Sequence, residues 1–241
     1  MYDFVLSSGH GLHVSGARDI IDEVTEARRV VDRVGEIMGG YSAVSIFHDD
    51  VSRNDRANLA AIVDHHNRQA RQMDVSIHFN AVGGGTRDAG IGVEVLYRAG
   101  DKYSRMVAGR VARLISEASG LILRRKWSLA PGTLPASGLA FLNNTTRPAI
   151  LVEVCFVNSR KDVQLYKENF DRVCYAIAEG LLQTGFSSKA KPEPEVALWA
   201  QDAWEWAKAE KIMDGTRPRD AMTRQEAVTM LHRVYLKTKV M

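Results

Sequence analysis

Four polar residues stand out in this chain because their types could assemble a hydrolytic metal site. His10 lies in the turn-rich stretch SSGHG, Glu26 in EARRVVDRV, His78 in VSIHFNA and Glu153 in LVEVCFV. Two histidines and one carboxylate are a complete protein ligand set for a catalytic Zn²⁺, which keeps its fourth position open. The metal would lower the pKa of a water at that position, so that hydroxide becomes available near neutral pH.

Glu153 is the most informative of the four, because an ionised carboxylate within an apolar strand carries a large desolvation cost. A nearby metal and its water would offset that cost. From this position the carboxylate could take a proton from an attacking water and pass it to a leaving amine. The alternative is a structural ion pair, for example with Arg147.

His78 occupies the polar side of a strand pattern. The apolar residues of VSIHFNA alternate with Ser76, His78 and Asn80, which is the period of a half-buried strand. His78 is close to the C-terminal end of that strand, where open α/β sheets build their sites. Taken alone, a structural histidine held by hydrogen bonds is the more common interpretation, so the prediction depends on partners elsewhere in the chain.

The composition is that of an ordinary globular protein, with 241 residues of which 45% are hydrophobic and 25% charged. This length allows one large domain, or one medium domain with a small appendage. The formal net charge of +3 suits an acidic polymer but is too small to indicate nucleic acid as a partner. The densest basic cluster, residues 124–126, is interpreted as a solvated loop.

The N-terminal stretch MYDFVLSSGHG has neither the basic nor the apolar region of a secretory signal peptide. No apolar run approaches the ~18 residues of a membrane span. We therefore expect a protein without a membrane span that starts out in the cytoplasm. The two cysteines, Cys155 and Cys174, form no CxxC motif, and the sequence leaves open whether they pair.

Strand and helix patterns alternate along most of the chain. Strands are predicted at 2–8, 43–47, 75–79, 91–97 and 149–157, and helices at 20–38, 53–72, 101–119 and 160–183. Residues 120–147 are predicted to be irregular. This alternation predicts an α/β fold with a mostly parallel twisted sheet flanked by helices.

The composition changes after Phe186. Residues 187–195, SSKAKPEPE, read as a linker, so we predict a catalytic domain over 1–186 and a small all-α module over 196–241. Helices are predicted there at 197–211 and 223–236, the second opened by the capping-box pair Thr223 and Glu226.

The stretches SSGHG, TEARRVVDRV, SIHFNA, GVEVLY and RPAILVEVCFVNSRKDV together resemble the zinc-dependent N-acetylmuramoyl-L-alanine amidases of the third amidase family. The resemblance covers about residues 2–183. The family's first motif usually begins Asp-Pro-Gly-His-Gly, and Ser-Ser replaces Asp-Pro here. The members are peptidoglycan hydrolases of bacteria and their phages.

By position, the resemblance implies that His10, Glu26 and His78 bind zinc and that Glu153 is the catalytic carboxylate. Glu23 lies one turn earlier on the same helix. We place Glu26 ahead of it because the apolar pattern after Glu26 aligns better with the family.

The implied reaction is hydrolysis of the amide between the lactyl group of N-acetylmuramic acid and L-alanine of the stem peptide. Zinc would polarise the carbonyl and stabilise the oxyanion while Glu153 moves the proton. Asn80 and Glu94 are candidate substrate contacts, although Glu94 could equally orient a ligand or be structural. The remaining histidines are predicted to lack a site role, namely His13, His48, His65, His66 and His232, with His65 and His66 solvated.

In the C-terminal module, AWEWAKAEKIMDGT and MTRQEAVTMLHRVY resemble a single S-layer-homology-type repeat. This resemblance implies binding to a secondary wall polymer. The alternative is that Trp199, Trp204 and Trp206 form the core of a helical pair or of a homodimer.

We predict a phage endolysin that accumulates in the cytoplasm until a separate permeabilising protein releases it to the wall. Three alternatives remain. One is a sporulation or mother-cell autolysin of the same chemistry. The second is a zinc peptidase acting on wall peptides, which an HExxH helix would have favoured, and the chain has none. The third is a wall-binding protein with an inactive catalytic domain.

Overall fold

The computed structural model describes residues 3–124, 132–182, 201–212 and 224–238. The chain divides into two compact units, Met1–Lys189 and Ala190–Met241, and each is described by itself. The predicted linker, Trp199 and the Thr223 cap lie outside the described residues, so the exact domain boundary stays a prediction. Among the described helices, none combines the length and apolar character needed to cross a membrane.

The first unit is built on a six-stranded sheet with the order β2-β1-β3-β6-β4-β5. The strands β2, β1, β3 and β6 run parallel, whereas β4 is antiparallel to β6 and β5 is parallel to β4. Their bounds are Phe4–Ser8 for β1, Val44–Phe47 for β2, Met73–Asn80 for β3, Glu94–Arg98 for β4, Thr133–Ala136 for β5 and Ala149–Phe156 for β6. The predicted mostly parallel sheet is confirmed.

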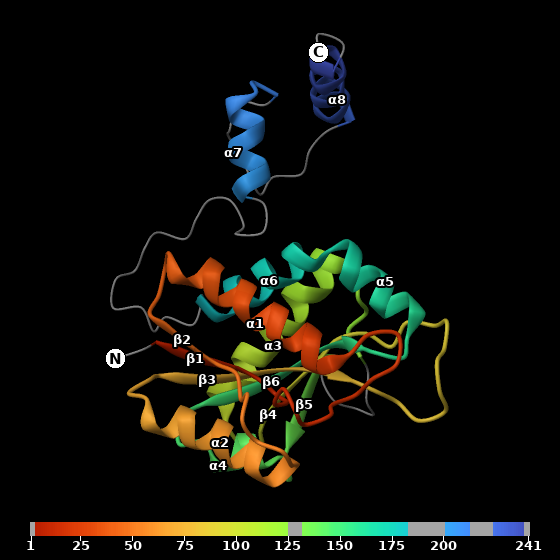
Figure 1. Cartoon of the computed structure of the whole chain (residues 1–241). Coiled ribbons are helices and arrows are strands. Elements are labelled where there is room, and N and C mark those ends of the chain that lie inside the picture. The colour runs from red at the N-terminus through yellow and green to blue at the C-terminus, as the bar shows by residue number, and fades with distance from the viewer. Residues whose placement is uncertain (1–2, 125–131, 183–200, 213–223, 239–241) are drawn as a thin grey trace. The chain divides into compact units, whose positions relative to one another are not determined.

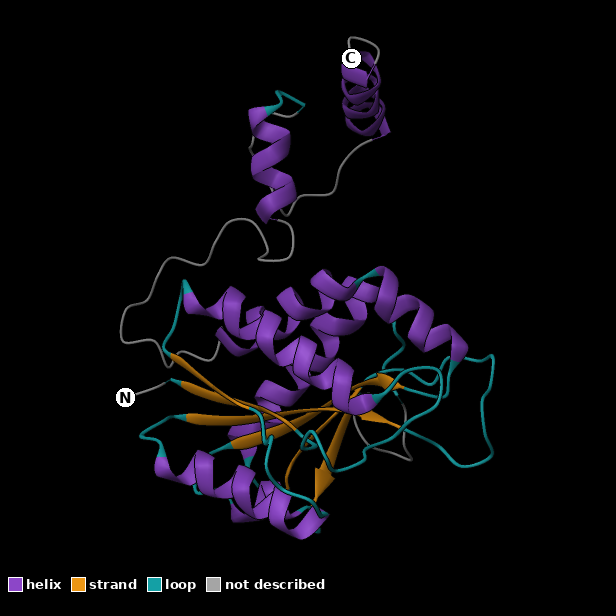
Figure 2. Ribbon diagram, in the orientation of Figure 1, coloured by secondary structure: helices purple, strands orange, loops and turns teal. Residues whose placement is uncertain are grey.

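Helices cover both faces of this sheet (Figures 1 and 2). The larger layer consists of α1 (Glu23–Gly39), α3 (Lys102–Ser119), α5 (Arg160–Glu168) and α6 (Phe170–Leu182). The smaller layer on the opposite face consists of α2 (Asp55–Arg68) and α4 (Ala140–Asn144). The described part of the second unit contains the helices α7 (Gln201–Ala209) and α8 (Arg224–Thr238), in agreement with the predicted all-α module.

Side-chain caps decide where the long helices begin. The carboxylate of Asp22 accepts a hydrogen bond from the Thr25 N–H at 3.0 Å, so α1 starts at Glu23 and not at residue 20. Asn54 and Asp101 cap α2 and α3 in the same way. The start of α1 matters because it fixes the direction in which Glu23 points.

Two predictions about secondary structure were wrong. The segment expected to be irregular contains β5 and α4, and β5 tolerates Pro135 because it is an edge strand. The helix expected over 160–183 is two helices separated at Asn169, whose backbone is not helical. The Asn169 side chain donates to the Leu165 carbonyl at 2.9 Å, and its own carbonyl accepts from the Val173 N–H, so it ends one helix and begins the next.

The strand β6 is the centre of the core. Its residues are buried except Glu153, which keeps some exposure. On the face toward α2 and α4, Ala149 and Leu151 of β6 join an apolar cluster with Ile62, Phe141 and Leu142. Cys155 on β6 and Cys174 on α6 are both buried and free, so they do not pair.

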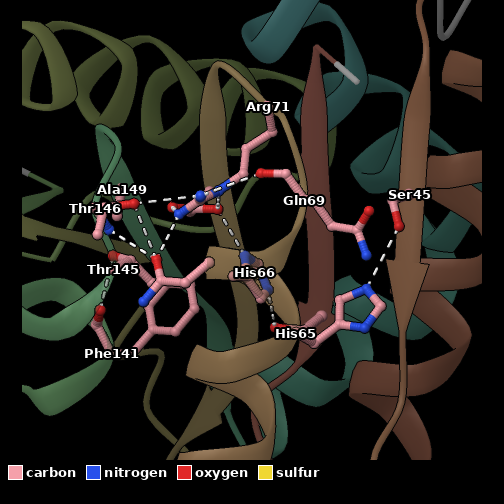
Figure 3. A network of polar contacts seen from close by, with 12 residues as sticks. Ser45, His65, His66, Gln69, Arg71, Phe141, Thr145, Thr146 and Ala149 are labelled. Carbon is pink, nitrogen blue, oxygen red and sulfur yellow. Dashed lines mark hydrogen bonds and ion pairs between the residues drawn. The ribbon is translucent and has the colours of Figure 1, made fainter. Parts of the chain in front are cut away.

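A buried polar network connects α2 to the sheet (Figure 3). The ring of His66 contacts Asp74 on β3 at 2.8 Å and the Ser7 hydroxyl on β1 at 3.0 Å. Arg71 donates to both oxygens of Asp74, at 2.6 and 2.7 Å. The prediction that His66 is solvated was therefore wrong.

Ser7, His66 and Asp74 have the connectivity of a serine hydrolase triad, but all three are 0% exposed, so substrate cannot reach the hydroxyl. Burial lowers the pKa of His66 more than Asp74 raises it, since Arg71 already neutralises that carboxylate. A neutral ring can then donate to Asp74 from one nitrogen and accept from Ser7 at the other. The network therefore serves to fasten α2 to β1 and β3.

This arrangement predicts that Asp74→Ala lowers the free energy of unfolding by about 3–5 kcal/mol, because Arg71 would remain buried without its partner. The matched control is Asp64→Ala, which removes an exposed Asp–Arg pair on α2 and should cost less than about 1 kcal/mol. Urea unfolding at pH 7 measures both. Equal losses in the two variants would show that the buried network contributes no more than a surface pair.

Candidate metal centre and active site

Three side chains from separate elements converge at the C-terminal ends of β1 and β3. His10 follows β1, Glu23 is the first residue of α1, and His78 lies near the end of β3; their ligand atoms all lie within 4.8 Å of one another. His78 Nδ1 is 3.0 Å from Glu23 Oε1, and His10 Nε2 is 3.6 Å from Glu23 Oε2. Such a group can hold one cation between two imidazoles and a carboxylate.

Two glycines make this convergence sterically feasible. A Cβ placed on Gly9 would lie 1.9 Å from His78 Cε1, so only glycine allows the turn before His10 to pass over the imidazole. A Cβ on Gly16 would lie 2.5 Å from Glu23 Oε2. The backbone of both loops therefore approaches the cluster more closely than any residue with a side chain permits.

Backbone amides fix the orientation of Glu23. The Ala17 N–H donates to Oε2 at 2.6 Å and the Phe79 N–H donates to Oε1 at 3.1 Å. Burial alone would raise the pKa of Glu23, but the hydrogen bond from His78, the charges of both rings and the Ala17 amide outweigh it and leave the pKa below its ordinary value. The carboxylate is therefore ionised, as a metal ligand must be.

The two histidines respond differently to this environment. Burial lowers the pKa of His10, which favours the neutral ring that binds metals. Burial would also lower the pKa of His78, but its hydrogen bond with Glu23 and the charge of Glu153 raise it overall. The same carboxylates that attract a proton to His78 would attract a metal cation to the cluster.

The structure does not place Glu26 in the cluster; Glu23, which the sequence analysis ranked second, lies there instead. The Glu26 carboxylate accepts from the Tyr166 hydroxyl at 2.7 Å and from Arg29 Nη1 at 2.8 Å. Because α1 begins at Glu23, that residue reaches the strand ends, whereas Glu26 lies one turn inside the helix and faces α5. The apolar pattern that favoured Glu26 reflects its burial against the core.

Glu153 lies beside this cluster. Its register partners are His78 on β3 and Glu94 on β4. Burial, reinforced by the charges of Glu23 and Glu94, raises the pKa of Glu153 to about 7. A carboxyl group with this pKa can both accept and return a proton near neutral pH. The alternative pairing with Arg147 is absent from the described residues, where Arg147 is exposed.

Asn80 and Glu94, the expected substrate contacts, bind each other. Asn80 Nδ2 donates to Glu94 Oε1 at 2.9 Å, and Arg124 pairs with the same carboxylate. The Arg124 guanidinium also lies over the Phe156 ring, 4.6 Å from its centroid. Contact of Asn80 or Glu94 with substrate stays a prediction.

Arg124, which was predicted to lie in a solvated loop, is instead half-buried beside the site. Gly92, at φ 101°, lets the chain pass beside Ile122, and the Arg124 N–H then donates to the Val93 carbonyl at 3.1 Å. This brings Arg124 next to Glu94. The one available signal was that a buried carboxylate such as Glu94 needs a cationic partner.

The donor set fits a divalent metal such as Zn²⁺. Two imidazoles and one ionised carboxylate match the ligand types and number of a catalytic zinc site. Two buried polar atoms at the site, His10 Nδ1 and Glu153 Oε2, have no hydrogen-bond partner among the residues that the structure describes. Buried polar groups are rarely left this way unless an ion, water or substrate completes the site.

The fold and the cluster together define an α/β protein with a candidate metal-dependent hydrolytic centre. The chain belongs to the N-acetylmuramoyl-L-alanine amidase family (Amidase_3), whose sequence model matches residues 4–183. The family resemblance predicted from the motifs is thus confirmed.

Relatives and solved structures agree with this membership. The chain is 29% identical over 197 residues to an uncharacterised 38.4 kDa protein of Clostridium perfringens, covering 80% of this chain and 54% of the relative. It therefore spans about half the length of that relative, and likewise of a second C. perfringens protein. It is also 24% identical to an endolysin of Bacillus phage SPP1 over 261 residues, covering 93% of this chain and 88% of the endolysin.

The catalytic domain of the CD27L endolysin targeting Clostridia difficile has the same fold. Its structure superimposes with a TM-score of 0.63 at 18% identity, over 76% of this chain and 98% of that domain.

If Glu23 holds a metal and Glu26 does not, the same substitution should lower metal affinity at position 23 and stability at position 26. Glu23→Gln should weaken zinc affinity by at least about 100-fold, since even outer partners of zinc ligands contribute 10–100-fold. Glu26→Gln should leave the affinity unchanged and lower the free energy of unfolding by about 1–3 kcal/mol, because the buried Tyr166 contact is weakened. Competition with a chromophoric chelator and urea unfolding measure the two effects. Loss of zinc affinity in Glu26→Gln alone would reverse the assignment.

Proposed function

We propose that this protein hydrolyses the amide bond between N-acetylmuramic acid and L-alanine in peptidoglycan, with Zn²⁺ held by His10, Glu23 and His78. The observation that carries the proposal is the convergence of these three side chains within 4.8 Å beside the buried Glu153. Membership of residues 4–183 in the amidase family supports the choice of bond.

When bound, the zinc would supply a Lewis acid that polarises the amide carbonyl and acidifies water. The protein contributes an ionised Glu23 and a neutral His10 to hold it. Glu153 accepts the proton of the attacking water and delivers it to the leaving nitrogen of L-alanine. The water oxygen bonds to the carbonyl carbon and the C–N bond then breaks, which leaves a lactyl carboxyl group and the amine of L-alanine; at neutral pH these are a carboxylate and an ammonium group.

The environment of Glu153 suits both halves of this proton transfer. Its pKa of about 7 means that neither the acid nor the base form is strongly favoured at neutral pH. Glu153 is also the residue of β6 that retains some exposure, although its Oε2 is buried. Asn80, held by Glu94, has a second amide hydrogen beyond the one used in that contact, and we assign it to substrate binding.

Mass spectrometry of products from purified peptidoglycan tests the proposed reaction. Stem peptides with a free L-alanine amine should appear, vanish on chelation and return with zinc. Glu153→Gln should lower turnover by about 10²–10⁴-fold, the usual contribution of an acid–base residue. Glu117→Gln, on the exposed surface of α3, is the control expected to retain activity.

Each alternative has its own outcome in this experiment. Cleavage within the stem peptide would favour the zinc peptidase and overturn the amide assignment. No cleavage by protein that still binds walls would favour an inactive, wall-binding protein.

For the biological role, we propose an endolysin that is released from the cytoplasm to degrade the host wall. Support comes from the SPP1 endolysin, because the similarity extends over 93% of this chain and includes both units. A sporulation or mother-cell autolysin would use the same residues and chemistry.

We propose that the second unit binds a secondary wall polymer, with a second copy of the chain as the alternative occupant. On α7, Trp206 is 56% exposed while Trp204 is half-buried, so at least one indole is accessible to a ligand. Exposed aromatic rings suit both sugar stacking and association between copies.

Truncation after residue 189 distinguishes these roles. In a Glu153→Gln background, where walls stay intact, the full chain should pellet with purified walls and the truncated chain should remain largely in the supernatant. Light scattering of both forms gives their masses. Equal pelleting would contradict wall binding by the second unit. A full chain with the mass of a dimer and a truncated chain with the mass of a monomer would favour association between copies.

A further inference from the structure

We propose that His48 is a positioning residue for the metal centre, linking the turn that carries His10 to the helix that carries Glu23. The inference rests on the proposed metal site.

Hydrogen bonds run from His48 toward both ligand-bearing elements. His48 Nδ1 is 3.0 Å from the hydroxyl of Ser8, the last residue of β1, and that hydroxyl is 3.4 Å from the His10 carbonyl oxygen. On the other side of the ring, Nε2 is 3.0 Å from Asp32 Oδ1 on α1. The imidazole thus bridges the strand end before His10 and the helix that begins at Glu23.

Burial restricts the movement of the contact between His48 and Ser8. Ser8 is 0% exposed, and the His48 side chain is 17% exposed, whereas Asp32 lies at the surface. When the ring is neutral and Nε2–H donates to Asp32, Nδ1 accepts a hydrogen bond from the Ser8 hydroxyl. When the ring is charged, Nδ1–H donates to Ser8 and the hydroxyl hydrogen can turn to the His10 carbonyl. The hydroxyl is held in either state.

Asp49 and Asp50, which follow His48, also connect the loop around His10 to α1. The carbonyl oxygen of Asp49 accepts from the Leu12 N–H at 2.8 Å and from Arg28 Nη2 on α1 at 2.9 Å. Arg28 also pairs with Asp50 at 2.7 Å. The segment after β2 therefore clamps the loop around His10 and the first turns of α1 in one place.

Such a clamp matters because a zinc site depends on the relative placement of its ligands. Hydrogen bonds outside the ligand set orient the ligands, and losing one typically weakens metal affinity by about 10–100-fold. The hydrogen bonds of the His48 ring go to Ser8 and Asp32 and not to the His10 ring or the Glu23 carboxylate, so its effect must pass through Ser8 and Asp32.

His65, on helix α2, provides a matched control because its ring contacts the edge strand β2 that precedes His48. Its ring also faces a serine hydroxyl, Ser45 at 3.5 Å, and is half-buried against Phe47 at a centroid distance of 4.2 Å (Figure 3). Among the described residues, no hydrogen bond or ion pair joins the His65 side chain to the turn that carries His10 or to α1. Substitution of either histidine by phenylalanine therefore perturbs the β2 edge, but only one substitution breaks the clamp.

The experiment compares His48→Phe and His65→Phe in the full chain by zinc competition with a chromophoric chelator and by urea unfolding of metal-free protein. His48→Phe should weaken zinc affinity by about 10–100-fold. His65→Phe should stay near the wild-type affinity. His48→Gln, whose amide can both donate and accept, should recover part of the loss. Asp32→Ala, an exposed change, should lower the affinity in the same direction by less.

The outcomes separate this inference from the proposed function. A wild-type protein that binds no zinc would overturn the metal site and this inference together. Zinc binding by the wild type with an unchanged affinity in His48→Phe and Asp32→Ala would overturn the positioning role alone. An equal loss of affinity in His65→Phe would show a general effect of the β2 edge and would also overturn it.

Discussion

The contact between Glu23 and His78 is the constraint on which the rest of the site depends. It joins the first residue of a helix to the end of a central strand, and both carboxylate oxygens are further held by the amides of Ala17 and Phe79. This requires α1 to begin at the right residue, which the Asp22 cap ensures. It also requires that the loops before and after His10 pass closely, which glycine allows at positions 9 and 16.

A second constraint comes from placing a carboxyl group on β6, a strand whose other residues are all buried. Glu153 follows Ala149 and Leu151 on the same side of β6, and this apolar row withholds the solvation that would keep its pKa low. Arg124 bonds Glu94 and not Glu153. Within the described part of the chain, Glu94 thus has a cationic partner whereas Glu153 Oε2 has no hydrogen-bond partner, and this asymmetry fits the proton-transfer role that we propose for Glu153.

The sequence predicted those parts of the site that local patterns determine. His10, His78 and Glu153 lie in or directly after strands with clear apolar patterns, and the ends of parallel strands meet at one edge of a sheet. Glu23 and Glu26 lie three positions apart on one helix, and the choice between them depended on a cap and on Tyr166, which is 140 residues distant from Glu26. The burial of His66 and the position of Arg124 were mispredicted for the same reason, because their partners are distant in sequence. The strand β5 and the helix α4 are too short to produce a reliable period.

The two serines that replace the family's usual Asp-Pro before Gly-His-Gly can now be interpreted physically. Alternation along β1 sends Ser7 and Ser8 to opposite faces of the sheet, and each hydroxyl meets a histidine there. Ser7 reaches His66 in the α2 layer, and Ser8 reaches His48, which leads on to α1. The strand end that precedes His10 is therefore tied to both helical layers. A chain without proline at this turn needs another source of rigidity, and the pair of serine–histidine contacts supplies it from both sides.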